Sequence, residues 1–124
     1  MSDRLTTYAP QGLALLRIAT ALLFLAHGTQ KILGFPDGMN PPLMSIFGAA
    51  GLIEIVAGLM ILVGFYTRPA AFIASGTMAV AYFMAHAPQS FFPSNNGGDA
   101  PILFCFVFLY LVFSGPGAWS ANKN

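Results

Sequence analysis

Long apolar stretches, separated by short polar or turn-rich links, dominate this chain. A helix needs about 20 residues to cross the ~30 Å hydrocarbon core of a bilayer, and four stretches come near that length. We expect membrane-spanning helices at about residues 12–33, 43–66, 69–87 and 100–114. The links are rich in Gly, Pro and Asn, which favour turns. The pattern predicts an all-α fold, a single integral membrane domain built as a four-helix bundle.

Composition strengthens the membrane interpretation and excludes several functions. The chain of 124 residues is 56% hydrophobic and 7% charged, against about 25% charged in soluble domains. A net charge of +1 indicates no strongly basic surface of the kind that binds nucleic acid. We expect the lipid bilayer to be the partner. A lone Cys105 excludes an intrachain disulfide and a Cys-x-x-Cys redox pair. We expect no metal site.

The few charges outside the apolar stretches predict an orientation. Arg4, Arg68 and Lys123 fall on one side of the four expected helices, whereas Asp37 and Asp99 fall on the other. Positively charged loops face the cytoplasm, so we expect both termini there. The first apolar stretch lacks a signal-peptide cleavage site, and we expect it to remain in the mature protein.

Charged residues also interrupt the apolar stretches themselves. Arg17, His27 and Lys31 share the first stretch, and Glu54 lies midway along the second. A charge at the bilayer centre costs about 2.5–3.5 kcal/mol on insertion scales, so such residues usually pair or line a polar interior. A rise of ~1.5 Å per residue places His27 nearest in height to Glu54. We therefore expect Glu54 to contact His27 or Arg17.

The same arithmetic gathers polar side chains near the outer ends of the helices. His27, Lys31 and His86 come close in height there, which predicts a pocket that opens outward and has Glu54 as its floor. The ligand-binding or polar-core candidates are Arg17, His27, Lys31, Glu54, Tyr82 and His86.

Several sequence pieces spread over nearly the whole chain carry a family pattern. They include LLRIATALLFLAHGTQKIL at residues 15–33, GLIEIVAGLMILVGFYTRPAA at residues 51–71 and SGPGAWS at residues 114–120. With these pieces the chain resembles the DoxX family of small four-helix membrane proteins. The resemblance implies characteristic polar residues at Arg17, His27, Lys31, Glu54, Arg68 and His86. Asp99 departs from the family pattern, because many members carry Glu there.

The resemblance implies a prokaryotic plasma (inner) membrane protein, and its namesake relatives are subunits of quinone-linked oxidoreductases. Our leading hypothesis is a membrane subunit of such a redox system, with other redox subunits or further copies of the chain as partners. The donors for a quinone headgroup would be His27, Lys31 and His86, with Glu54 relaying protons and Phe24, Tyr82 and Phe83 lining the ring site.

Other functions stay open on sequence alone. A non-enzymatic membrane scaffold or assembly subunit fits the small size and the lack of a soluble domain. A haem held by His27 and His86 has little support, because two histidines at unconstrained spacing are a weak signal. A small proton-coupled transporter is a further alternative. The sequence decides neither whether the protein is an enzyme nor which cofactor it binds, because nothing in the spacing selects a quinone over a lipid headgroup or a small anion.

Overall fold

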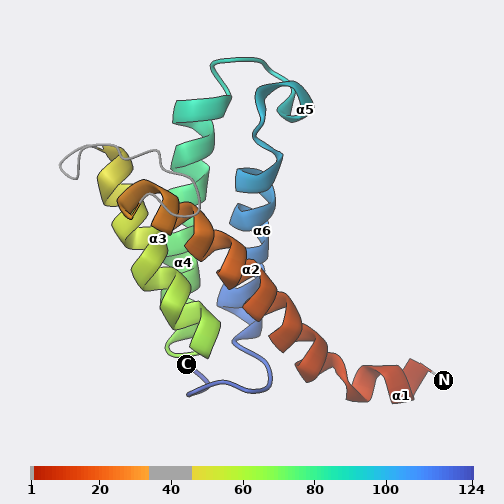
Figure 1. Cartoon of the computed structure of the whole chain (residues 1–124). Helices are drawn as coiled ribbons and strands as arrows, with labels where there is room; N and C mark the ends of the chain where they lie inside the picture. The colour runs from red at the N-terminus through yellow and green to blue at the C-terminus, as the bar shows by residue number, and fades with distance from the viewer. Residues whose placement is uncertain (1, 34–45) are drawn as a thin grey trace.

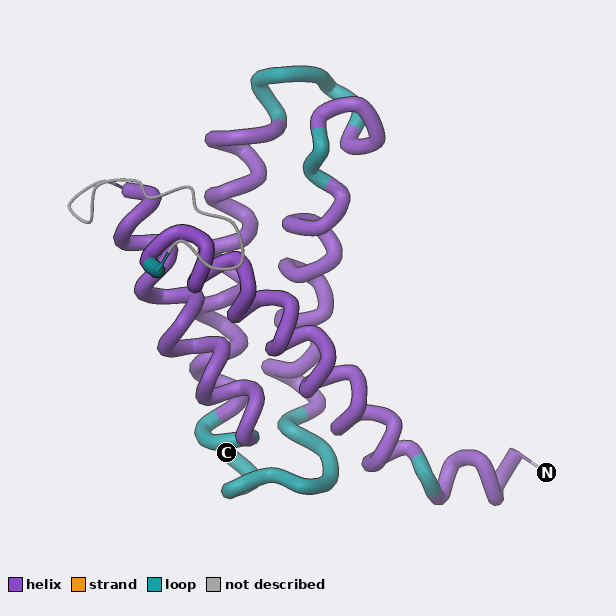
Figure 2. The backbone as a smooth tube through the Cα atoms, in the orientation of Figure 1, coloured by secondary structure: helices purple, strands orange, loops and turns teal. Residues whose placement is uncertain are grey.

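A computed structural model describes residues 2–33 and 46–124, which form helices and no strands (Figure 1). The helices are α1 (Ser2–Thr7), α2 (Ala9–Ile32), α3 (Ile46–Val63), α4 (Thr67–Ala81), the π-helix η1 (Tyr82–His86), α5 (Pro93–Asn96) and α6 (Asp99–Ser114). The predicted all-α fold is therefore confirmed over these residues. Among the described residues, the longer loops lie at the two ends of the bundle (Figure 2).

The four long helices match the four apolar stretches, with small shifts at their ends. The second helix begins three residues earlier than expected, because Pro10 suits a first helical turn. At the ends of α3 and α6, Gly64 and Gly115 adopt positive φ values of 72° and 76°, which helical residues do not adopt. The expected start at residues 43–45 lies outside the described residues. Short helices α1 and α5 were not predicted.

Helix length and composition single out α2. Among the described residues, it is the one helix that is both long and apolar enough to cross a membrane. Shorter apolar helices occupy Gly48–Val63 and Asp99–Ser114. At 1.5 Å per residue, the 16 residues of α6 extend about 24 Å.

The long helices form two closely packed pairs. The first pair is α2 with α3 and the second is α4 with α6, while α3 also packs on α4. Figure 1 shows α2 running obliquely across the front of the bundle rather than parallel to its neighbours. The two termini lie at one end of the molecule and α5 lies at the other.

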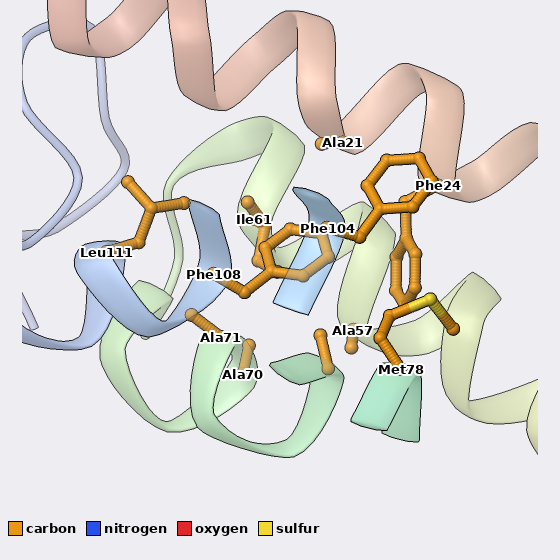
Figure 3. Close-up of a cluster of buried hydrophobic side chains, with 11 residues drawn as sticks. Ala21, Phe24, Ala57, Ile61, Ala70, Ala71, Met78, Phe104, Phe108 and Leu111 are labelled. Atoms are coloured by element: carbon orange, nitrogen blue, oxygen red, sulfur yellow. The ribbon is translucent and has the colours of Figure 1, made fainter. Parts of the chain in front are cut away.

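An aromatic cluster joins the two pairs in the core (Figure 3). Phe24 of α2 lies 4.8 Å from Phe108 and 5.7 Å from Phe104 of α6, measured between ring centroids. Alanines of α4, including Ala71 and Ala74, are fully buried beside them. Small residues on one helix therefore make room for large rings from another, which is how close packing is reached.

Glycines bring α2 and α3 into contact. A methyl group on Gly28 would lie 2.9 Å from Cγ1 of Ile55 and 3.0 Å from Cβ of Glu54. A methyl group on Gly51 would lie 2.9 Å from Cβ of Lys31. Both positions thus require the absence of a side chain, as small residues allow at tight helix interfaces.

Candidate functional site

A buried ion pair joins α2 to α3. Nζ of Lys31 donates to Oε1 of Glu54 at 2.5 Å. The carboxylate side chain has no exposed surface, while the lysine side chain keeps 14% of its own. The other carboxylate oxygen, Oε2, is buried and has no hydrogen-bond partner within the described residues. Solvent therefore reaches the pair only from the lysine side, and the second carboxylate oxygen is enclosed by protein.

The expectation that Glu54 contacts His27 or Arg17 is wrong. The height arithmetic assumed upright helices that begin level with one another, whereas α2 crosses α3 obliquely (Figure 1). Each charged residue instead starts opposite a glycine of the other helix, Lys31 opposite Gly51 and Glu54 opposite Gly28. The space that the glycines leave allows the two side chains to meet.

A pocket of about 850 Å³ lies beside this ion pair, toward the end of the molecule that carries α5. This volume is in the range of sites that enclose a small organic molecule. Its apolar wall includes Ile53, Phe72, Ile73, Met78, Met84 and Phe104. Its polar lining residues include His27, Lys31, Glu54, Thr77, His86 and Gln89. The site is thus mostly apolar and has a few polar groups on its wall, as ligand pockets commonly do.

A hydrogen bond to the loop that follows it holds the side chain of His86 in place. Its Nδ1 lies 3.0 Å from the main-chain oxygen of Asn96. The Asn96 amide in turn donates to Oη of Tyr82 and to the oxygen of Ser90, and its Oδ1 accepts from the nitrogen of Gly98. Asn96 is buried, so it acts as the centre of a small polar network that supports the histidine.

Four of the six candidate residues line the same pocket: His27, Lys31, Glu54 and His86. Tyr82 lies outside the lining, where its hydroxyl supports Asn96. The aromatic lining also differs from expectation, because Phe24 is buried in the core and Phe83 is 70% exposed. Phe72 and Phe104 line the pocket instead, and His27 makes an edge contact with Phe104 at 5.6 Å.

Arg17 lies at the opposite end of the molecule and is completely buried. Its Nη1 donates to the main-chain oxygens of Pro116 and Ala118, and its Nη2 donates to that of Trp119. These acceptors belong to residues 115–124, which we name the C-terminal strap. Arg17 thus holds the strap against α2 and takes no part in the pocket.

The C-terminal strap also bonds to the start of α2 and to the end of α3. The nitrogen of Ala118 donates to Pro10, that of Ala121 to Val63 and that of Asn122 to Gly64. Arg68 donates to the last carbonyls of α6, those of Val112 and Phe113, as basic residues at helix C-termini often do. Sequence reasoning missed the strap, although the closely spaced glycines of SGPGAWS were a signal for a sharply turning segment.

Metal chemistry receives no support from the described residues. They contain no group of three or more His, Cys, Asp or Glu side chains that could hold a metal ion. Cys105 is a free thiol whose sulfur lies 3.4 Å from the Ser75 hydroxyl, between α4 and α6. It is part of a helix interface.

Comparisons with known proteins identify a family and several relatives of this chain. The model of the DoxX family matches residues 12–87. A Haemophilus influenzae protein is 44% identical, with 98% of this chain and 96% of that protein aligned. Inner membrane protein YphA of Escherichia coli is 28% identical, with 93% and 91% aligned. Inner membrane protein YqjF of the same organism is 29% identical, with 90% of each aligned.

No solved structure gave a significant match. The family match covers more than half of the chain, and the Haemophilus influenzae relative aligns over almost all of it. The chain belongs to the DoxX family.

Proposed function

We propose that the protein spans the bacterial inner membrane as a four-helix bundle with both termini in the cytoplasm. Two relatives are named inner membrane proteins, which supports the location. Large apolar side chains lie exposed along the helices, among them Leu22 and Leu23 of α2, Leu59 of α3 and Phe106 of α6. A water-soluble monomer rarely exposes such extended apolar surface, whereas lipid chains would cover it.

Within the membrane, we propose a subunit of a redox system that binds a quinone-like ligand in the pocket. The observation that carries this proposal is a buried Lys31–Glu54 ion pair in the wall of a largely apolar 850 Å³ pocket. An apolar ring and its tail fit such walls. A quinone carbonyl needs a donor, and the lysine ammonium has three hydrogens, of which the pair with Glu54 uses one.

The ion pair suits this role because it is held in place before a ligand arrives. Burial of the Glu54 carboxylate and the glycine contacts around it fix the lysine stem. A fixed donor in a site with little water interacts more strongly with a ligand oxygen than a mobile one in water. His27 and His86 add two further polar groups to the lining.

The test is binding of a short-tailed benzoquinone to the purified protein in lipid nanodiscs. We expect Lys31→Met to weaken binding at least tenfold, since it removes the donor and leaves the carboxylate unpaired. Lys123→Met is the matched control, because Lys123 is exposed at the far end of the molecule and lines no part of the pocket. This control should bind as the wild type does.

Two outcomes would contradict the proposal. One is the absence of saturable binding to the wild-type protein in nanodiscs. The other is unchanged binding by Lys31→Met and His86→Phe variants that remain folded by circular dichroism and thermal unfolding. Either outcome would favour a scaffold or assembly subunit, in which the polar groups only fix how the helices pack.

A further inference from the structure

The hydrogen bond between His86 and Asn96 determines which nitrogen of His86 carries a proton. The partner of Nδ1 is a main-chain carbonyl oxygen, at 3.0 Å, and such an oxygen can only accept. Nδ1 must therefore be the donor. In a neutral imidazole the proton then sits on Nδ1, and Nε2 is left as an acceptor with a free lone pair. Within the described residues no hydrogen bond reaches Nε2.

The surroundings hold this arrangement in place. Asn96 is 3% exposed and is tied by its side chain to Tyr82, Ser90 and Gly98, so its carbonyl has little freedom to move. A side chain at Gly98 would collide with the ring of Tyr82, at 2.4 Å from Cε2. His86 ends the π-helix η1, and such wide turns are frequent at functional sites.

The pocket wall thus carries an acceptor as well as a donor. The acceptor is Nε2 of His86, a residue that lines the pocket. Lys31 is the donor. We had expected His86 to donate to a quinone carbonyl, but a neutral His86 with its proton on Nδ1 cannot do so.

We propose that the pocket selects the reduced, hydroxyl-bearing form of its ligand, with one ligand hydroxyl donating to Nε2 of His86. The inference rests on the proposed function and names the form of the ligand that this site prefers. A hydroquinone has two hydroxyls, so one oxygen donates to His86 while the other accepts from Lys31. A quinone has only acceptor oxygens and leaves Nε2 without a partner.

The first test measures which ring nitrogen of His86 carries the proton. The chain has two histidines, so His27→Phe leaves His86 as the only one. Nitrogen NMR of this variant, labelled with ¹⁵N-histidine in mildly alkaline buffer, separates protonated from unprotonated ring nitrogens. We expect the proton on Nδ1 and a bare Nε2. A proton on Nε2 would overturn the proposal.

The second test compares three probes with one ring: a benzoquinone, its hydroquinone, and the dimethyl ether of that hydroquinone. The ether keeps the oxygens and the shape but has no hydroxyl hydrogen to donate. We expect the wild-type protein in nanodiscs to bind the hydroquinone about three- to tenfold more tightly than the ether, the usual value of one net hydrogen bond. The quinone should also bind more weakly than the hydroquinone.

Substitution at His86 completes the design. His86→Phe keeps a ring of similar size without an acceptor, and His86→Leu is a second variant in case the first does not fold. In either variant the hydroquinone and its ether should bind equally. Equal binding of all three probes to the wild type would overturn the inference while leaving the proposed function standing. A lack of binding by every probe would overturn both.

Discussion

At the scale of single residues, the two partners of the ion pair are not equivalent. Glu54 has no exposed surface, whereas the Lys31 side chain keeps 14%. A lysine has a flexible four-carbon stem with which its charge can reach water, but a buried carboxylate on a short side chain cannot. Removing the Lys31 ammonium therefore leaves the Glu54 carboxylate buried and unpaired. Removing the carboxylate leaves a lysine whose charge can still reach water.

This asymmetry predicts an order of stability. Lys31→Met should lower the free energy of unfolding by about 3–5 kcal/mol, the usual cost of leaving one buried charge unpaired. Glu54→Gln should cost less, because Lys31 can turn toward the surface. The double variant, Lys31→Met with Glu54→Gln, should recover part of the loss. Thermal unfolding in detergent measures all three, and a Glu54→Gln variant less stable than Lys31→Met would contradict the argument.

At the scale of helices, the contact between α2 and α3 sets the geometry of the site. Gly28 meets Glu54 and Ile55, and Gly51 meets Lys31, with no space for a methyl group at either glycine. These contacts fix both the separation and the register of the two helices. The ion pair depends on that register, because both of its members lie beside the contact.

A methyl group added at this contact should therefore act on the whole site. Gly28→Ala places a carbon 3.1 Å from the main-chain oxygen of Gly51 and should push the helices apart, at a cost of about 1–3 kcal/mol. Gly12→Ala, on the same helix, meets nothing within 4 Å and should be neutral or stabilising. The unfolding temperature and the quinone affinity are measured for both variants and compared with those of the wild type. Equal effects of the two changes would show that the contact is not tight.

Hydropathy alone predicted the four long helices, because each apolar stretch is bounded by turn-forming residues. It also gathered His27, Lys31 and His86 at one end, since position along a helix follows from residue number. It failed for the partner of Glu54, which depends on how obliquely α2 crosses α3. It also could not place the main-chain oxygen of Asn96 against Nδ1 of His86, because that oxygen belongs to a loop that follows no periodic pattern.

At the scale of the whole molecule, the C-terminal strap ties the ends of the helices together. It bonds to Arg17 and Pro10 near the start of α2 and to Val63 and Gly64 at the end of α3. Arg68 meanwhile joins the start of α4 to the end of α6. The end of the bundle opposite the pocket is thus closed by hydrogen bonds to main-chain groups.

Loss of Arg17 should loosen this closed end and leave the pocket end intact. We expect Arg17→Met to speed hydrogen exchange at the amides of Ala118, Ala121 and Asn122 at least tenfold, since hydrogen bonds to a charged group contribute about 1.5–3 kcal/mol each. Arg4→Met is the control, because Arg4 is exposed on α1. Unchanged exchange in Arg17→Met would show that the strap holds without the arginine.

The proposed orientation is tested by labelling from outside the cell. Single cysteines replace Asp3 and Asn95, both exposed and at opposite ends of the molecule, in a chain whose own Cys105 is changed to Ser. A membrane-impermeant maleimide should label the cysteine at position 95 in intact cells and the one at position 3 only after lysis. Labelling of both positions in intact cells would contradict a cytoplasmic N-terminus.

The bonds of Arg17 have a consequence for how the chain is made. Its partners lie 99 to 102 residues later in the sequence. At a synthesis rate of about 5–20 residues per second, they leave the ribosome roughly 5–20 s after Arg17. During that time the guanidinium of Arg17 has none of its final acceptors. The bundle is therefore completed late, because Arg17 meets its acceptors only after the C-terminal strap has been synthesised.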